Sequence, residues 1–61
     1  MPYVNVRLAG EVTEEQKTAL CKKITDVITE VTGKPAQYTY VVLEEVPREN
    51  WSIGGVRLSD R

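Results

Sequence analysis

The sequence predicts an α/β (α+β) fold, in which a strand, a helix and a second strand form one β-α-β unit followed by a short C-terminal hairpin. Three observations favour it: polar and apolar residues alternate over residues 3–9, apolar residues recur at the helical period over residues 13–33, and β-branched and aromatic residues dominate residues 38–44. With 61 residues, the chain has room for a single domain, residues 1–61.

The first strand is expected over Tyr3–Ala9 because its side chains alternate between two faces. One face is apolar and the other is mixed; they carry Val4, Val6 and Leu8 on one side and Tyr3, Asn5, Arg7 and Ala9 on the other. Gly10 then breaks the strand.

A helix is expected from Thr13, because Thr13 and Gln16 have the spacing of a capping box. One apolar stripe follows at the helical period, made of Leu20, Ile24, Val27, Ile28 and Val31. Gly33 is suited to a left-handed C-terminal cap, and Pro35 prevents the helix from resuming. The helix therefore ends near Gly33.

The second strand is expected over Tyr38–Glu44, ending before Pro47. The long connection through the helix predicts that the two strands run parallel. Residues 48–58 contain a double glycine, Gly54-Gly55, and predict a loop that leads into a short hairpin.

One helix covers only one face of such a sheet, although parallel sheets are ordinarily covered on both. The opposite face, with Arg7, Tyr38 and Tyr40, is therefore expected to meet another subunit or to line a pocket. A chain this short usually needs a disulfide, a metal or partner subunits. Its single cysteine cannot form an intrachain disulfide, and the absence of histidine removes the usual zinc ligands. Homo-oligomerisation is the prediction that remains.

Charge and hydropathy exclude several classes of function. Eight Lys and Arg against nine Asp and Glu give a net charge of −1, and the basic residues are scattered, so no nucleic acid partner is expected. No apolar run approaches the length that crosses a bilayer, and no secretory signal pattern opens the chain. We expect a cytoplasmic protein with no membrane partner.

Conventional catalytic sets are missing, because a chain without histidine has no ordinary Ser or Cys triad. The unusual candidate is Pro2. Removal of Met1 would leave a free secondary amine, which near neutral pH could serve as a general base. Two alternatives stay open. In one, Pro2 has only a structural role at the start of an edge strand, where a backbone N–H donor is not needed. In the other, Met1 is retained, and the Pro2 nitrogen is then an amide that cannot act as a base.

The chain resembles the 4-oxalocrotonate tautomerase family over essentially its full length, through Met1-Pro2, Gly10, the helix start at residues 13–17, residues 42–46 and residues 50–55. The resemblance implies a β-α-β subunit with a C-terminal hairpin, assembled as a hexamer built from a trimer of dimers. It also implies that Pro2 moves a proton between carbons of a dienol and its conjugated keto acid, with no metal or organic cofactor.

Two positions depart from the family. Val12 and Tyr40 stand where its best-studied members have arginines that bind a dicarboxylate, and neither side chain offers a charged fork. The resemblance transfers Trp51 and Ile53 as the apolar pocket wall near Pro2. A smaller, monoanionic acid such as a phenylpyruvate-like keto acid is therefore the expected substrate.

Local reasoning adds Arg7, Tyr38 and Tyr40 as substrate-binding candidates, because a guanidinium can hold a carboxylate and a hydroxyl can donate to an enolate oxygen. The alternatives are that Arg7 lines a wet channel or pairs with an acid between subunits, and that the tyrosines and Trp51 only pack.

The function predicted is that of a tautomerase (isomerase) acting on a small unsaturated keto acid through Pro2. A hydratase or dehalogenase with protonated Pro2, and a non-catalytic ligand-binding oligomer, are the alternatives.

Overall fold

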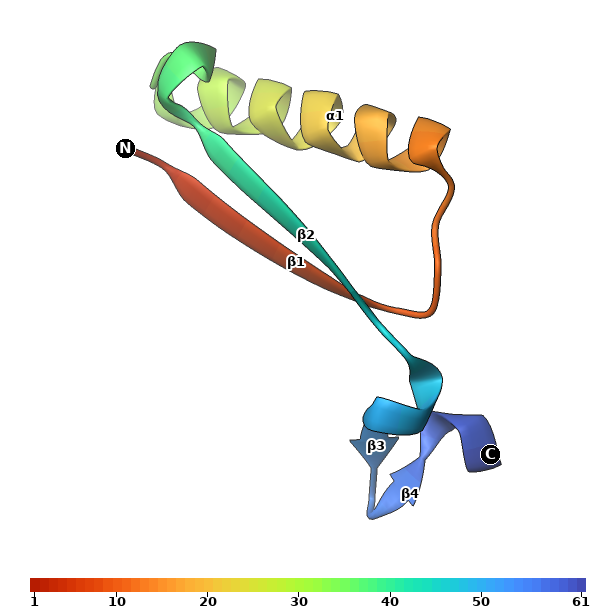
Figure 1. Ribbon diagram of the computed structural model, residues 1–61. Coiled ribbons are helices and arrows are strands. Elements are labelled where there is room, and N and C mark those ends of the chain that lie inside the picture. Colours follow the sequence, from red (N-terminus) through yellow and green to blue (C-terminus); the bar gives the residue numbers. More distant parts are fainter.

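In the computed structural model, which describes residues 1–61, two long parallel strands lie side by side and one helix runs across one face of them (Figure 1). The strands are β1 (Tyr3–Ala9) and β2 (Tyr40–Val46), and the helix is α1 (Glu14–Thr32). A small antiparallel hairpin, β3 (Ser52–Ile53) and β4 (Val56–Arg57), projects beyond the C-terminal end of β2. The predicted β-α-β unit with a C-terminal hairpin is confirmed.

The register of β1 and β2 decides which side chains share a face. Val4 pairs with Val41 and Val6 with Leu43, and all four are half-buried on the face that α1 covers. Asn5 pairs with Val42, and Arg7 pairs with Glu44, on the opposite face. The alternation expected for the first strand is therefore present, and its uncovered face is polar and aromatic as predicted.

The second strand begins and ends two residues later than its sequence predicted. Three hydrogen bonds hold the preceding residues in a 3-10 turn: Tyr38 N donates to Pro35 O at 3.1 Å, Thr39 N to Ala36 O at 3.1 Å, and the Thr39 hydroxyl to Pro35 O at 3.2 Å. Pairing with β1 starts only at Tyr40 and continues to Val46, next to Pro47. The prediction that Tyr38 lies on the strand beside Tyr40 was therefore wrong.

Both ends of α1 are capped as the sequence predicted. The Thr13 hydroxyl accepts from Gln16 N at 3.1 Å, and the Gln16 side chain accepts from Thr13 N at 2.9 Å. At the other end Gly33 adopts a left-handed conformation, with φ of 76°, and its N–H donates to Thr29 O at 2.9 Å. Local signals thus determine where this helix begins and ends.

The N-terminal cap gives the first testable prediction. Thr13→Ala removes the hydroxyl that accepts from Gln16 N, so it is expected to lower the free energy of unfolding by about 1 kcal/mol. Urea unfolding followed by circular dichroism, at a fixed subunit concentration, measures the change. Thr13→Ser keeps the acceptor and is the matched control, and equal stability of all three proteins would contradict a capping role.

The single chain encloses no core: none of its residues is buried. Its radius of gyration is 14.5 Å, whereas a compact chain of this length would have roughly 10 Å. Val27 and Val31, at the end of the apolar stripe of α1, stay 54% and 76% exposed because two strands are too few to cover them. None of the helices combines the length and apolar character that spanning a bilayer requires.

Candidate active site

Pro2 lies at the start of β1 and is fixed to the beginning of β2. Its carbonyl oxygen accepts a hydrogen bond from Tyr40 N at 2.9 Å, and its ring is half-buried. Tyr40 itself is 55% exposed and sits opposite Tyr3 on the face away from α1. The residue predicted to be catalytic is thus held by the sheet next to an available tyrosine.

Tyr38 belongs to the same end of the molecule but to a different element, the 3-10 turn Ala36–Tyr38 that precedes β2. The hydroxyls of Tyr38 and Tyr40 make no hydrogen bond within the chain, so both are free to donate to a ligand or to a neighbouring subunit. The structure therefore keeps the two tyrosines as separate candidates near Pro2.

Trp51 and Ile53 lie at the other end of the chain from Pro2, beyond the C-terminal end of β2 (Figure 1). The seven residues of β1 alone span about 23 Å. Pro2 and Trp51 of one chain are therefore too far apart to line the same pocket. Trp51 is fixed locally, because its N–H donates to Arg48 O at 3.3 Å and its carbonyl accepts from Leu58 N at 2.7 Å. The predicted pocket is divided between two ends of the molecule.

Arg7 lies beside Trp51, at the end of the sheet away from Pro2. A pocket of ≈350 Å³ at the C-terminal end of the strands is lined by Arg7, Val46, Asn50, Trp51 and Ser52. Sequence reasoning missed Asn50 and Ser52 as candidates. The only sequence feature that pointed to them is that they flank Trp51. Their proximity to Arg7 depends on the register of β1 and β2, which the sequence does not reveal.

Arg7 also takes part in a polar cluster on the open face of the sheet. Its Nε lies 3.5 Å from Glu44 Oε1, and Asn5 Nδ2 donates to the same oxygen at 2.5 Å. The Asn5 hydrogen bond and, after it, the Arg7 charge lower the pKa of Glu44 from its ordinary value. One of the alternatives for Arg7 was pairing with an acid between subunits; within the chain its acid partner is Glu44.

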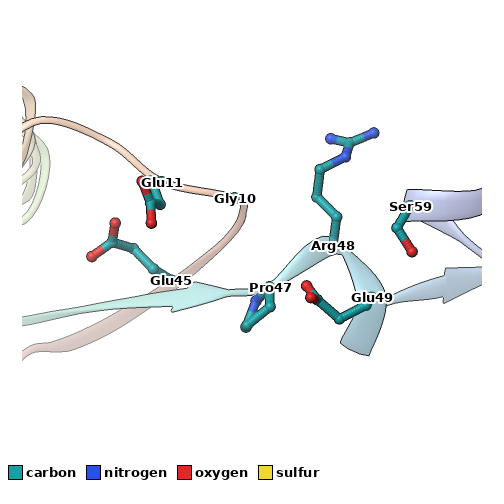
Figure 2. A pocket seen from close by; sticks show the side chains of 7 residues that line it. All are labelled: Gly10, Glu11, Glu45, Pro47, Arg48, Glu49 and Ser59. Carbon is teal, nitrogen blue, oxygen red and sulfur yellow. The ribbon is translucent and has the colours of Figure 1, made fainter.

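The largest pocket, of ≈630 Å³, lies where the loop after β1 passes the end of β2, and Figure 2 shows its lining side chains. Three of them are carboxylates, Glu11, Glu45 and Glu49, while the Arg48 side chain points away from Glu11 and Glu45. This surface would repel an anionic keto acid. No group of three or more His, Cys, Asp or Glu side chains in the chain is arranged to hold a metal ion.

Glu45 has a structural role in that region. Its carboxylate lies 2.7 Å from Lys17 Nζ and accepts from Val12 N at 3.1 Å, so it joins β2 to α1 and to the loop before it. The Lys17 hydrogen bond, and then that of Val12, lower the pKa of Glu45, while Glu45 raises the pKa of Lys17. Glu45 thus lies on the face that α1 covers, whereas Glu44 lies on the open face with Asn5 and Arg7.

The direction of that shift predicts a pH-dependent effect of Glu45→Gln. A carboxyl group with a lowered pKa stabilises the fold above its unfolded pKa, near 4.5, and that contribution disappears as the pH falls through the folded value. The variant is therefore expected to be less stable than wild type at neutral pH and to approach it below 4.5. Urea midpoints across this range test it; a difference that does not depend on pH would contradict the ionic role.

Comparison with solved structures defines the class of protein. A homologue of 4-oxalocrotonate tautomerase superposes with a TM-score of 0.93 at 37% sequence identity, over 98% of each chain. A 4-oxalocrotonate tautomerase isozyme from Methylibium petroleiphilum gives a TM-score of 0.90 at 39% identity, over 97% of this chain and 95% of the other. The β-α-β unit with its terminal hairpin is the fold of these small tautomerases.

Sequence comparison gives the family. The family model described as tautomerase enzyme matches residues 2–61. A protein of Bacillus cereus named probable tautomerase is 44% identical over 61 residues, which cover all of both chains. The 2-hydroxymuconate tautomerase of Bacillus subtilis is 38% identical over 60 residues, covering 98% of this chain and 97% of the other. The chain belongs to the tautomerase family, a family of isomerases, as its resemblance implied.

Proposed function

We propose that the protein is a tautomerase that interconverts a small unsaturated keto acid and its enol, with the free amine of Pro2 as the proton carrier. Family membership supports the reaction class. The observation that carries the proposal is the position of Pro2: it is the first residue held by the sheet, its carbonyl is fixed by Tyr40 N, and its nitrogen becomes the terminus once Met1 is removed.

The proposed step begins with a neutral Pro2 amine. It removes a proton from the carbon next to the carbonyl; the electrons of that C–H bond form the C=C bond, and the carbonyl electrons move to oxygen. The Tyr40 hydroxyl, which has no partner in the chain, donates to the developing enolate oxygen. The protonated amine then gives its proton to that oxygen, which completes the enol. In the reverse direction the neutral amine takes the enol proton and returns it to carbon. Apolar surroundings disfavour the ammonium form and keep the amine available near neutral pH.

The complete site requires more than one subunit. Pro2 and Trp51 are too far apart to meet within one chain, and no residue of the chain is buried by the chain itself. We therefore infer a homo-oligomer, a hexamer arranged as a trimer of dimers, in which Trp51 and Ile53 of one subunit cover Pro2 of another. The protein acts in the cytoplasm on a small soluble acid and uses no cofactor.

The proposal predicts a preference among acids. Because Val12 and Tyr40 replace charged residues, a monoanionic substrate such as phenylpyruvate is expected to give a higher kcat/KM than the dicarboxylate 2-hydroxymuconate. The change in ultraviolet absorbance between enol and keto forms measures both reactions. A clear preference for the dicarboxylate would show that another cationic group binds its second carboxylate.

The pH dependence separates a basic Pro2 from the alternative of a hydratase or dehalogenase with protonated Pro2. A base must be neutral, so kcat/KM for enol formation is expected to rise as the pH increases through the pKa of Pro2 and then to level off. An acid requires the charged form, so the hydratase or dehalogenase reading predicts a fall over the same interval. A profile that falls would therefore overturn the basic role, and absence of any turnover would favour a ligand-binding oligomer.

A further inference from the structure

Glu45 lies on the face of β2 that α1 covers, and its contacts bear on the position of Trp51. Strand β2 leads into the turn Arg48–Asn50, and Trp51 follows directly. Val46, the last residue of β2, lines the same pocket as Trp51. We propose that Glu45 is a positioning residue for the reaction: by fixing the end of β2 to α1 and to the loop after β1, it holds Trp51 in place.

The end of β2 has little other support within the chain. Its only neighbouring strand ends at Ala9, the partner of Val46. Gly10 then turns the chain away, with φ of 93°, and its N–H makes the last bond between the two segments, to Val46 O at 2.9 Å. Beyond Val46 no strand of the sheet continues beside the chain. The placement of Trp51 relative to the sheet therefore depends on what fixes the last residues of β2.

The Glu45 carboxylate ties those last residues to two other segments. Oε1 lies 2.7 Å from Lys17 Nζ on α1, and Oε2 accepts from Val12 N at 3.1 Å. Both bonds favour the charged carboxylate, and they lower the pKa of Glu45. The Lys17 and Glu45 side chains are 31% and 29% exposed, so solvent screens this pair less than a pair on an open surface.

The turn after β2 transmits this constraint to Trp51. Pro47 O accepts from Asn50 N at 2.9 Å, and Arg48 O accepts from Trp51 N at 3.3 Å. On its other side, Trp51 O accepts from Leu58 N at 2.7 Å. Trp51 thus belongs to a hydrogen-bonded unit, and Pro47 is the only residue between that unit and β2. A change at the end of β2 consequently moves Trp51.

This inference rests on the proposed function in one respect, namely that Trp51 covers Pro2 of another subunit. When Glu45 no longer holds the end of β2, the pocket wall is displaced while the amine is unaffected. The substrate is then bound less well, which raises KM. A role in stability alone would lower the fraction of folded protein, which reduces the apparent kcat and leaves KM unchanged.

The test begins with Glu45→Gln, which keeps the shape of the side chain and removes its charge. In the assembled variant, KM for phenylpyruvate enol is expected to rise about 10-fold, since a displacement of about 1 Å can cost up to about 100-fold. The value of kcat should fall less than about 2-fold. Trp51 is the only tryptophan, and its fluorescence anisotropy without substrate should fall. Lys17→Met removes the same ion pair, so the double variant should be no worse than Glu45→Gln.

Asp26→Asn is the matched control, because Asp26 forms an ion pair of the same length, 2.7 Å, with Lys22 inside α1. It should leave KM and the anisotropy unchanged. An unchanged KM in Glu45→Gln, an unchanged Trp51 anisotropy, or the same changes in Asp26→Asn would each overturn the positioning role. If Pro2→Ala stays fully active while Glu45→Gln still raises KM, the proton carrier is wrong and the role of Glu45 stands.

Discussion

Pro2→Ala is expected to reduce kcat/KM for tautomerisation by at least about 100-fold, the lower end of what a positioned general base contributes. The variant replaces the secondary amine of the pyrrolidine ring by a primary amine on a flexible terminus. Both the basicity and the position of the nitrogen change, while the carbonyl that accepts from Tyr40 N is retained. The rate of ketonisation of phenylpyruvate enol measures the loss.

The control for this variant is its assembly. Size-exclusion chromatography with light scattering should give the same oligomer as wild type, because Pro2 contributes only a backbone bond to the sheet. Turnover that stays at the wild-type level in a properly assembled Pro2→Ala protein would mean that another group moves the proton.

A mixture of two inactive variants is expected to recover activity. Pro2→Ala removes the amine and Trp51→Ala removes the pocket wall, and the two residues lie at opposite ends of the chain (Figure 1). If each site takes Pro2 and Trp51 from different subunits, random mixing in equal amounts leaves about one quarter of the sites with both native residues. The measurement is the rate after the two proteins are unfolded together and refolded.

The corresponding control omits the exchange of subunits. Folded Pro2→Ala and Trp51→Ala oligomers that are combined without unfolding should stay as inactive as each alone. Mixed oligomers demonstrated by mass spectrometry that nevertheless recover nothing would refute a site shared between subunits, and would require each Pro2 to work with the Trp51 of its own chain.

The elements with local signals were predictable from sequence. Thr13 with Gln16 and Gly33 mark the ends of the helix, and the structure shows both caps. The start of the second strand was missed, since Tyr38 and Thr39 favour a strand by type while backbone hydrogen bonds to Pro35 and Ala36 hold them in a turn. Residue preference is a weak guide where a neighbouring turn competes for the same backbone groups.

The site was predictable only in part, for a geometric reason. Pro2, Trp51 and Ile53 were predicted one by one as site residues, and their separation within the chain follows from the length of β1 and the parallel pairing with β2. The same register places Arg7 beside Asn50, Trp51 and Ser52. Such a grouping depends on residues distant in sequence, so no local pattern reports it.

The central claim is that a free amine on Pro2 carries the proton, and the state of Met1 tests it most directly. Two preparations of the same chain are compared by intact mass and by turnover, one with Met1 removed and one in which Met1 is retained by omitting the processing enzyme. Retained Met1 makes the Pro2 nitrogen a peptide amide without a basic lone pair. We expect activity in proportion to the fraction that begins at Pro2. Equal turnover by protein whose mass shows Met1 fully retained would contradict the mechanism.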